Sequence, residues 1–242
     1  MTTAQTIPWK RITVEAFAIV VSILLAFAID AWWDERGERS EEAEILLGLR
    51  KEFLLNKETL DRHLSLHEES LLLYKQLLTA AYSDDWQSHE LDIDRTLNWL
   101  LSPTTTDIGG GVLVGLVNSG RIELLSSRTL REKLAGWEGV FGEVRDDEVW
   151  NSELISDRII PYLQRQGVPL GSVFRWEGVD WPTAARTLLE DTDALSRLIT
   201  DREFLTLVEL RYGYGAHTTG EFQEAIAAAD EILIELDQSI SR

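Results

Sequence analysis

The chain contains no cysteine, and this absence excludes disulfide bonds, thiolate nucleophiles and cysteine metal sites. Basic residues are also scarce, since 23 lysines and arginines stand against 42 acids and the formal net charge is −19. A surface this negative repels phosphate backbones, so nucleic acid is not an expected partner. The acids are spread along the chain rather than gathered in a tail, which favours a role in solubility.

Catalytic motifs are lacking as well. The sequence has no Gly-x-Ser-x-Gly and no His-Glu-x-x-His, and it has only four histidines. His63 and His67 are four residues apart, so they share one helical face as a metal-binding pair would. His89 and His217 lie in other segments, so we prefer to interpret the pair as polar core residues that face acids of neighbouring helices. We expect no catalytic residue, no cofactor and no metal, and hence not an enzyme.

A glycine-rich stretch, Gly109 to Gly111, raises the question of phosphate binding. Glycine-rich phosphate loops follow a strand and open a helix. No strand pattern precedes this stretch and no Gly-Lys-Ser/Thr follows it. The sequence therefore predicts an ordinary loop here.

One long apolar run is present, from Ile12 to Trp33. At ~1.5 Å per residue it reaches about 33 Å, which matches the ~30 Å hydrocarbon core of a bilayer. We predict a transmembrane helix over 12–33, followed by one domain over 34–242. The run is flanked by tryptophans that suit the two headgroup levels, namely Trp9, Trp32 and Trp33.

The basic residues of the tail 1–11, Lys10 and Arg11, predict a cytoplasmic N-terminus and a domain on the far side of the membrane. Arg36 and Arg39 follow the run, so the difference in positive charge is small. Cleavage after Ala26-Phe27-Ala28 as a signal peptide is the alternative. The helical pattern that continues through these residues favours an uncleaved span.

One face of the predicted span is polar or small. Its members recur at intervals of three or four residues, and we call them the span stripe: Glu15, Ala18, Ser22, Ala26 and Asp30. Small residues let two helices approach closely, and an acid in a bilayer normally faces protein or water. We expect this stripe to contact another membrane helix, and chance combined with snorkelling acids is the alternative.

From Leu46 to Leu77 residues repeat at alternating intervals of three and four, as in an a/d seam. The seam consists of Leu46, Leu49, Phe53, Asn56, Leu60, His63, His67, Ser70, Tyr74 and Leu77. It predicts one long helix over 40–82 that is packed in a bundle, after a charged stalk in which Gly37 is a weak point.

Further helices are predicted over 91–101, from the N-cap Ser127 onward with a break near Pro161, over 183–189 and 194–200, and from the N-cap Asp201 to about Ile240. Gly213, Gly215 and Gly220 should interrupt or thin the last one. Gly136, Gly139 and Gly142 predict a close helix approach. No strand pattern occurs. The predicted fold is all-α, with the membrane helix continuing through the stalk into an antiparallel helical bundle.

Three segments, EAFAIVVSILLAFAIDAWWDER, LLGLRKEFLLN and LVNSGRIELLSSRTLREKLAGW, together resemble an uncharacterised family of bacterial single-span helical membrane proteins. The motifs of that resemblance are Glu52 with Asn56, Ser119 with Gly120, and Leu130 with Arg131. It covers roughly 12–60 and 112–140. The resemblance implies an anchored helical protein of the bacterial inner membrane and no catalytic activity.

Together these features predict a non-enzymatic membrane-anchored subunit or scaffold that binds other membrane proteins, copies of itself, and lipid. An extracytoplasmic helical sensor or ligand-binding module is one alternative. An ion-coupled stator-like subunit that uses Glu15 or Asp30 is another, although such a role usually places its acid deeper in the membrane.

Overall fold

The computed structural model describes the backbone of residues 9–168 and 192–241, with side chains from Phe17 onward except that of Ala18 and those of 192–193. Within these ranges the chain is helical and contains no strand, which confirms the all-α fold. The main helices are α1 (Trp9–Ala81), α2 (Ile93–Leu101), α3 (Gly111–Asn118), α4 (Arg128–Leu154), α5 (Ile160–Arg165), α6 (Thr192–Thr200) and α7 (Arg202–Ile240). Two 3₁₀ turns, η1 (Trp86–Ser88) and η2 (Arg121–Leu124), and a π-helical turn, η3 (Ile155–Ile159), lie between them.

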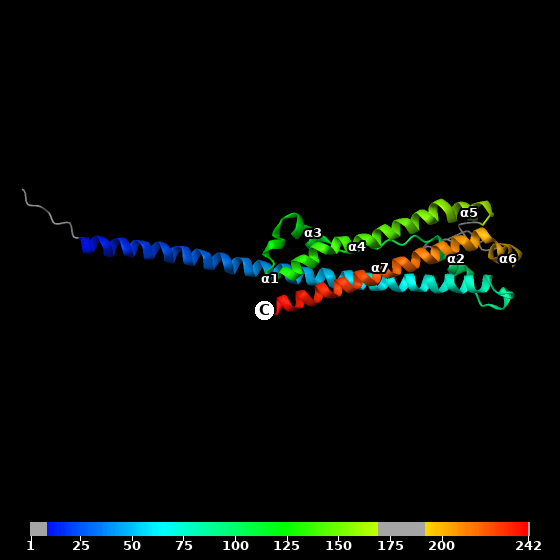
Figure 1. Ribbon diagram of the computed structural model, residues 1–242, viewed down its shortest axis with the longest axis horizontal. Coiled ribbons are helices and arrows are strands. Elements are labelled where there is room, and N and C mark those ends of the chain that lie inside the picture. The colour runs from blue at the N-terminus through cyan, green and yellow to red at the C-terminus, as the bar shows by residue number, and fades with distance from the viewer. Residues whose placement is uncertain (1–8, 169–191, 242) are drawn as a thin grey trace, which may run out of the picture.

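The first helix, α1, combines the predicted span, the stalk and the seam helix in one unbroken helix of 73 residues. Gly37 does not interrupt it. Figure 1 shows its first part, in dark blue, projecting beyond the other helices. Among the residues whose side chains are described, no helix is both long enough and apolar enough to cross a membrane.

The last helix, α7, packs against both α1 and α4 (Figure 1). Arg50 pairs with Asp237 and Lys57 with Asp230, while the Tyr82 hydroxyl donates to Glu209. Residue numbers fall along α7 as they rise along α1, so the two helices are antiparallel. Ion pairs also join α7 to α4 and α5, Lys133 with Glu231 and Arg165 with Glu203. Their numbers likewise fall along α7 as they rise along α4 and α5, so these helices are antiparallel to α7 as well. The predicted antiparallel bundle is therefore confirmed.

Helices α4 and α7 begin at the N-cap residues that the sequence predicts. The Ser127 hydroxyl accepts a hydrogen bond from the Leu130 N–H, and Asp201 accepts from the N–H groups of Glu203 and Phe204. Each cap satisfies N–H groups that have no partner within the first turn. At Pro161 the predicted break takes the form of the π-helical turn η3, after which the helix continues as α5.

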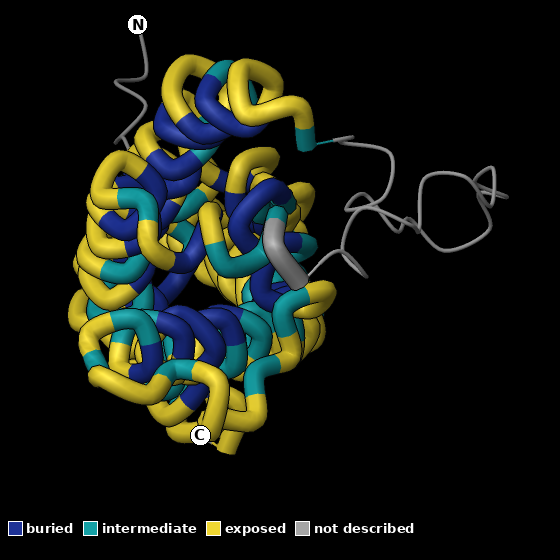
Figure 2. Tube along the Cα trace, turned by 90° about the vertical axis from the view of Figure 1, so that its right-hand side faces the viewer, coloured by how far each residue is buried: buried dark blue, intermediate teal, exposed yellow. Residues whose placement is uncertain are grey.

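The interior consists of two apolar clusters, one toward each end of the bundle. The cluster nearer the projecting part of α1 contains Leu49, Phe53, Leu60, Trp137, Phe141 and Phe222. The other contains Tyr74, Leu77, Leu100, Ile159, Tyr162 and Phe204. In the end-on view of Figure 2 the buried faces of the helices turn inward. The predicted seam lies in this interior, with His63 only half-buried.

Two predictions about glycine are wrong. A Cβ added at Gly136 or Gly139 would meet nothing within 4 Å, so these glycines lie on an open face rather than against a neighbouring helix. The close approach occurs at Gly215 instead, where a Cβ would lie 3.1 Å from Leu71 Cδ2. Gly213, Gly215 and Gly220 do not interrupt α7, because packing against two helices outweighs their low helix propensity.

The predicted helix over 183–189 lies outside the described residues. The neighbouring prediction over 194–200 is confirmed by α6.

Candidate functional site

Between the two apolar clusters lies a band of polar side chains, which we call the polar layer. It comprises His63, His67 and Ser70 of α1, Thr104 and Thr106 of the segment before α3, Asp147, Glu148 and Asn151 of α4, and Arg211, His217 and Thr218 of α7. Most of these side chains are buried, which requires hydrogen-bond partners for their polar atoms.

The segment 102–110 has no regular secondary structure and runs between α1 and α4. Its Thr106 N–H and hydroxyl donate to the two oxygens of Glu148, at 3.0 and 2.7 Å. Since the hydroxyl proton points to Glu148, the His63 Nδ1, 2.9 Å away, must be the donor to the Thr106 oxygen. Burial, and secondarily the charge of Asp107, raises the pKa of Glu148. This segment therefore joins α1 to α4.

Asn151 is the centre of a second set of contacts. Its Nδ2 donates to the Thr218 hydroxyl and to the Asp147 carbonyl, both at 3.0 Å, and its Oδ1 accepts from the Arg211 guanidinium. Arg211 also donates to the Ser102 carbonyl at 3.2 Å. Each amide atom of Asn151 is thereby used, which fixes its orientation. The contacts tie α4, α7 and the segment after α2 together.

The polar layer reaches solvent at His217. Its Nδ1 lies 2.7 Å from Asp147 Oδ2, and the histidine side chain is 63% exposed while that of Asp147 is buried. The hydrogen bond and the charge of Asp147 raise the pKa of His217. Acidic partners were predicted for His63 and His67 instead, but His63 bonds to Thr106 and His67 packs beside Phe222.

His67 lies deep in the layer beside the ring of Phe222, at 5.0 Å between centroids. Burial, and then the positive charge of Arg211, lowers the pKa of His67 to about 4. His63, which shares this helical face with His67, is engaged with Thr106. In the described part of the chain, no group of three or more histidine and acidic side chains is arranged to hold a metal ion.

The motif pair Glu52 and Asn56 holds the glycine-rich stretch. Glu52 accepts from the N–H groups of Val112 and Leu113 at 2.7 and 3.2 Å, so it caps the start of α3. Asn56 donates to and accepts from the backbone of Gly109, both at 2.7 Å. A carboxylate thus occupies the position that a phosphate would need at the α3 N-terminus. We call these four contacts the α3 clamp.

The other two motifs of the resemblance shape the connection that follows α3. Gly120 has φ of +70°, a left-handed conformation that favours glycine, and it ends the turn after α3. Leu130 is fully buried and Arg131 donates to the Leu125 carbonyl. These residues have structural roles.

The predicted membrane-contact residues lie in the projecting part of α1. Ser22, Ala26 and Asp30 are exposed there, and Trp32 and Trp33 are exposed and pack edge to face. The structure does not bring them into contact with the bundle. The side chains of Trp9, Glu15 and Ala18 lie outside the described residues.

Sequence reasoning missed Glu148, Asn151 and Arg211. A signal was present, because Glu148 and Asn151 continue the spacing of the buried Phe141 and Val144 along α4. Arg211 likewise continues the buried positions of α7. A polar residue at a position that continues a buried stripe predicts a buried polar contact.

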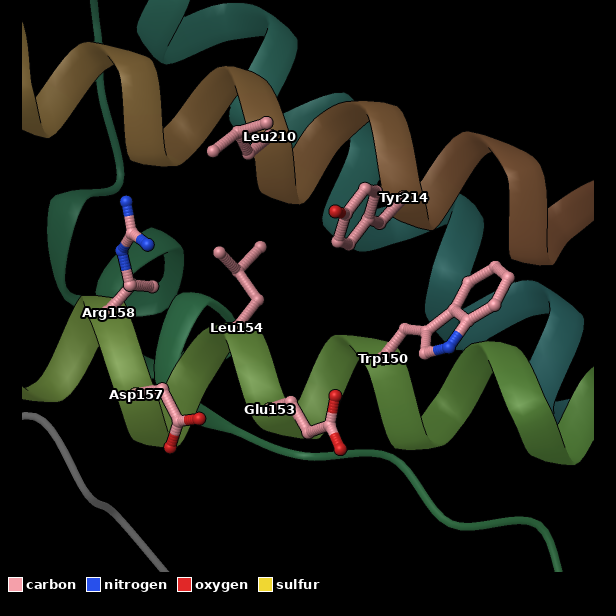
Figure 3. Close-up of a pocket in the computed structure, with 7 residues that line it drawn as sticks. All are labelled: Trp150, Glu153, Leu154, Asp157, Arg158, Leu210 and Tyr214. Atoms are coloured by element: carbon pink, nitrogen blue, oxygen red, sulfur yellow. The ribbon is translucent and has the colours of Figure 1, made fainter.

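An open groove of about 530 Å³ lies on the outer side of α4 and α7 (Figure 3). Trp150, Leu210 and Tyr214 form its apolar walls and are 57%, 38% and 42% exposed. Arg158 points toward α7, while Glu153 and Asp157 point away from it. The groove is an apolar surface with charged side chains at its edge.

Comparison of the chain with protein-family models, curated proteins and solved structures finds no match.

Proposed function

We propose that the chain is a non-enzymatic, single-pass subunit or scaffold of a membrane protein assembly. In this proposal residues 12–33 span the bacterial inner membrane with the N-terminus in the cytoplasm. The bundle stands outside the cytoplasm on the same helix. The observation that supports this most is the difference along α1: large apolar side chains between Phe17 and Trp33 are exposed, while the seam of the same helix is buried.

Exposed apolar surface of this extent needs a cover, and lipid is one that suits a helix apolar on every side. The exposed large apolar side chains are Phe17, Ile19, Val20, Val21, Ile23, Leu24, Leu25, Phe27, Ile29, Trp32 and Trp33. Between Asp34 and Glu44 the helix becomes highly charged, as expected where it leaves the headgroups. Since α1 is unbroken, the bundle would be held rigidly relative to the span.

Partner binding would then use helix–helix contacts. In the membrane the span stripe supplies small and polar side chains, which permit close approach of another helix. Outside the membrane the groove of Trp150, Leu210 and Tyr214 supplies an apolar surface. The two surfaces suit other membrane subunits or further copies of this chain.

The anchoring half of the proposal is tested by extraction and topology. The full chain should remain in the membrane fraction after alkaline carbonate and dissolve in detergent. A C-terminal reporter that is active only outside the cytoplasm should be active. A chain released by carbonate, or a mature N-terminus at Ile29, would contradict an uncleaved anchor.

The assembly half is tested by copurification from detergent with Ala26→Leu. The added bulk should separate close-packed helices and release the partner, because lost van der Waals contact between helices cannot be replaced by lipid. Leu24→Ile is the matched control and should retain the partner. Asp30→Asn should also retain it, whereas a proton carrier would assemble and lose its activity. Normal recovery of the partner with Ala26→Leu would mean that the stripe is not the contact.

A ligand-binding or sensing module is the second candidate function. The observation that favours it is the polar layer. Buried polar residues reduce the apolar surface that the bundle buries, and they suit a site that recognises a small polar molecule.

A further inference from the structure

The groove on the outer side of α4 and α7 presents aromatic and aliphatic side chains to solvent (Figure 3). Leu154 is buried at its centre, while Trp150 and Tyr214 are more than one-third exposed on either side. Exposed tryptophan and tyrosine contribute more binding energy to protein contacts than most other residue types. An apolar groove between two helices suits a third helix, whose apolar residues at intervals of three and four would lie in it.

One edge of this groove is acidic. Along α4 and η3, Asp146, Trp150, Glu153 and Asp157 recur at intervals of four, three and four residues, so they share one helical face. The three acids are exposed, and in the part of the chain that the structure describes none of them forms an ion pair. Glu153 and Asp157 lie about one turn apart with the same charge, which destabilises the helix. A cation brought by a partner would relieve this repulsion.

The charge of the whole chain favours the same kind of partner. Arg158 is the basic residue among those that line the groove, against Glu153 and Asp157. The net charge of −19 attracts a basic partner and repels an acidic one over a longer range. A second copy of this chain would bring the same negative charge to the groove. Local and overall charge therefore both favour a basic protein over a second copy.

We propose that this groove binds a basic amphipathic helix of another protein. The apolar side chains of that helix would contact Trp150, Leu210 and Tyr214, and its lysines or arginines would face Glu153 and Asp157. The inference rests on the proposed function, since it names the chemistry of the partner at one of the two contact surfaces. Its residues all lie in the bundle, so it can be tested separately from the span stripe.

The probe is a synthetic helical peptide of about 18 residues, with leucines at intervals of three and four and lysines elsewhere. A second peptide has glutamates in place of the lysines. Fluorescence anisotropy measures binding to the full chain in an uncharged detergent, after subtraction of the signal from protein-free micelles. The lysine peptide should bind at least about tenfold more tightly than the glutamate peptide, and its affinity should fall as salt rises. Equal affinities, or no binding of the lysine peptide up to about 100 µM, would overturn the proposal.

Variants then place the peptide. Trp150→Ala should weaken binding of the lysine peptide about 30-fold, the loss typical of a central aromatic residue of an interface. Ile234→Ala is the matched control, because Ile234 is an equally exposed apolar residue of α7 that does not line the groove. Asp157→Asn should weaken binding and reduce its dependence on salt, since it removes one charge and leaves the apolar walls intact. Unchanged binding in Trp150→Ala would place the peptide elsewhere and overturn the proposal.

Two further measurements separate this proposal from its alternatives. Ala26→Leu should leave peptide binding unchanged, because Ala26 lies in the projecting part of α1. Failure of the span stripe and failure of the groove therefore give different results. Light scattering of the full chain tests a second copy as the occupant. A dimer that Trp150→Ala dissociates would assign the groove to self-association and overturn the proposal.

Discussion

The two parts of α1 have the same backbone and opposite surroundings. From Phe17 to Trp33 the large apolar side chains point in every direction and are exposed. From Leu46 to Leu77 they are concentrated on one face, which α7 and the shorter helices cover. A helix that packs against other helices on one face needs apolar side chains on that face only. A helix with apolar side chains all round needs an apolar environment on every side. The comparison separates the part of α1 that the rest of the chain covers from the part that it leaves exposed.

The largest expected effect compares two phenylalanines of α1. Phe53 is fully buried and packs edge to face with Trp137 at 5.0 Å, so Phe53→Ala should lower the free energy of unfolding by about 3–5 kcal/mol. Phe27→Ala should leave the stability of the bundle unchanged, because Phe27 lies in the projecting part. Chemical denaturation of the detergent-solubilised chain measures both. Similar losses for the two variants would show that the two parts of α1 are not energetically distinct.

The second prediction concerns pH and the polar layer within the covered part. The pKa of His67 is lowered to about 4 in the folded state from its ordinary value near 6.5. Between these two values the unfolded chain binds a proton at His67 and the folded chain does not. The free energy of unfolding therefore falls as pH drops from about 6.5 to 4. The loss attributable to His67 is at most about 3 kcal/mol.

Other groups of the layer must be separated from His67. Burial, and then the charge of Arg62, lowers the pKa of His63, which contributes in the same direction. The raised pKa of Glu148 acts in the opposite direction, because folding favours its protonation, while the raised pKa of His217 changes stability only above about pH 6.5. His67→Gln should flatten the fall between pH 6.5 and 4, and His89→Gln, in a connecting segment, should not. An unchanged slope in His67→Gln would mean that another group controls it.

The third prediction compares polar side chains of the two parts. Asn56→Ala removes two hydrogen bonds from the backbone of Gly109 and should cost about 2 kcal/mol, with the greatest loss of amide-exchange protection in α3. Asp30→Asn in the projecting part should not change bundle stability. Equal protection of α3 in Asn56→Ala and the unmodified chain would show that the α3 clamp is not what positions this helix.

The features that could be predicted from the sequence are those that depend on residues close together in the chain. The seam and the caps Ser127 and Asp201 depend on residues close in sequence, and the sequence predicts each of them. The contacts of the segment 102–110 were not predicted, because they are made with Asn56, His63 and Glu148, which are distant along the chain. Gly136 and Gly215 show the same limit, since spacing alone does not tell an open glycine from one against another helix.

The smallest expected effect compares two glycines of α1. A Cβ at Gly37 would meet nothing within 4 Å, so Gly37→Ala gains helix propensity of up to about 1 kcal/mol and meets no steric penalty. A Cβ at Gly48 would lie 3.4 Å from Val112 Cγ1, an ordinary van der Waals distance, so Gly48→Ala gains the same propensity and adds a contact with α3. Amide exchange should therefore slow about fivefold around Gly37 in the first variant, with no change in the Tm of the bundle. In the second variant amide exchange in α3 should stay unchanged. Faster exchange near Gly37 in Gly37→Ala would contradict an open helix face at that position, and would mean that another surface approaches the stalk there.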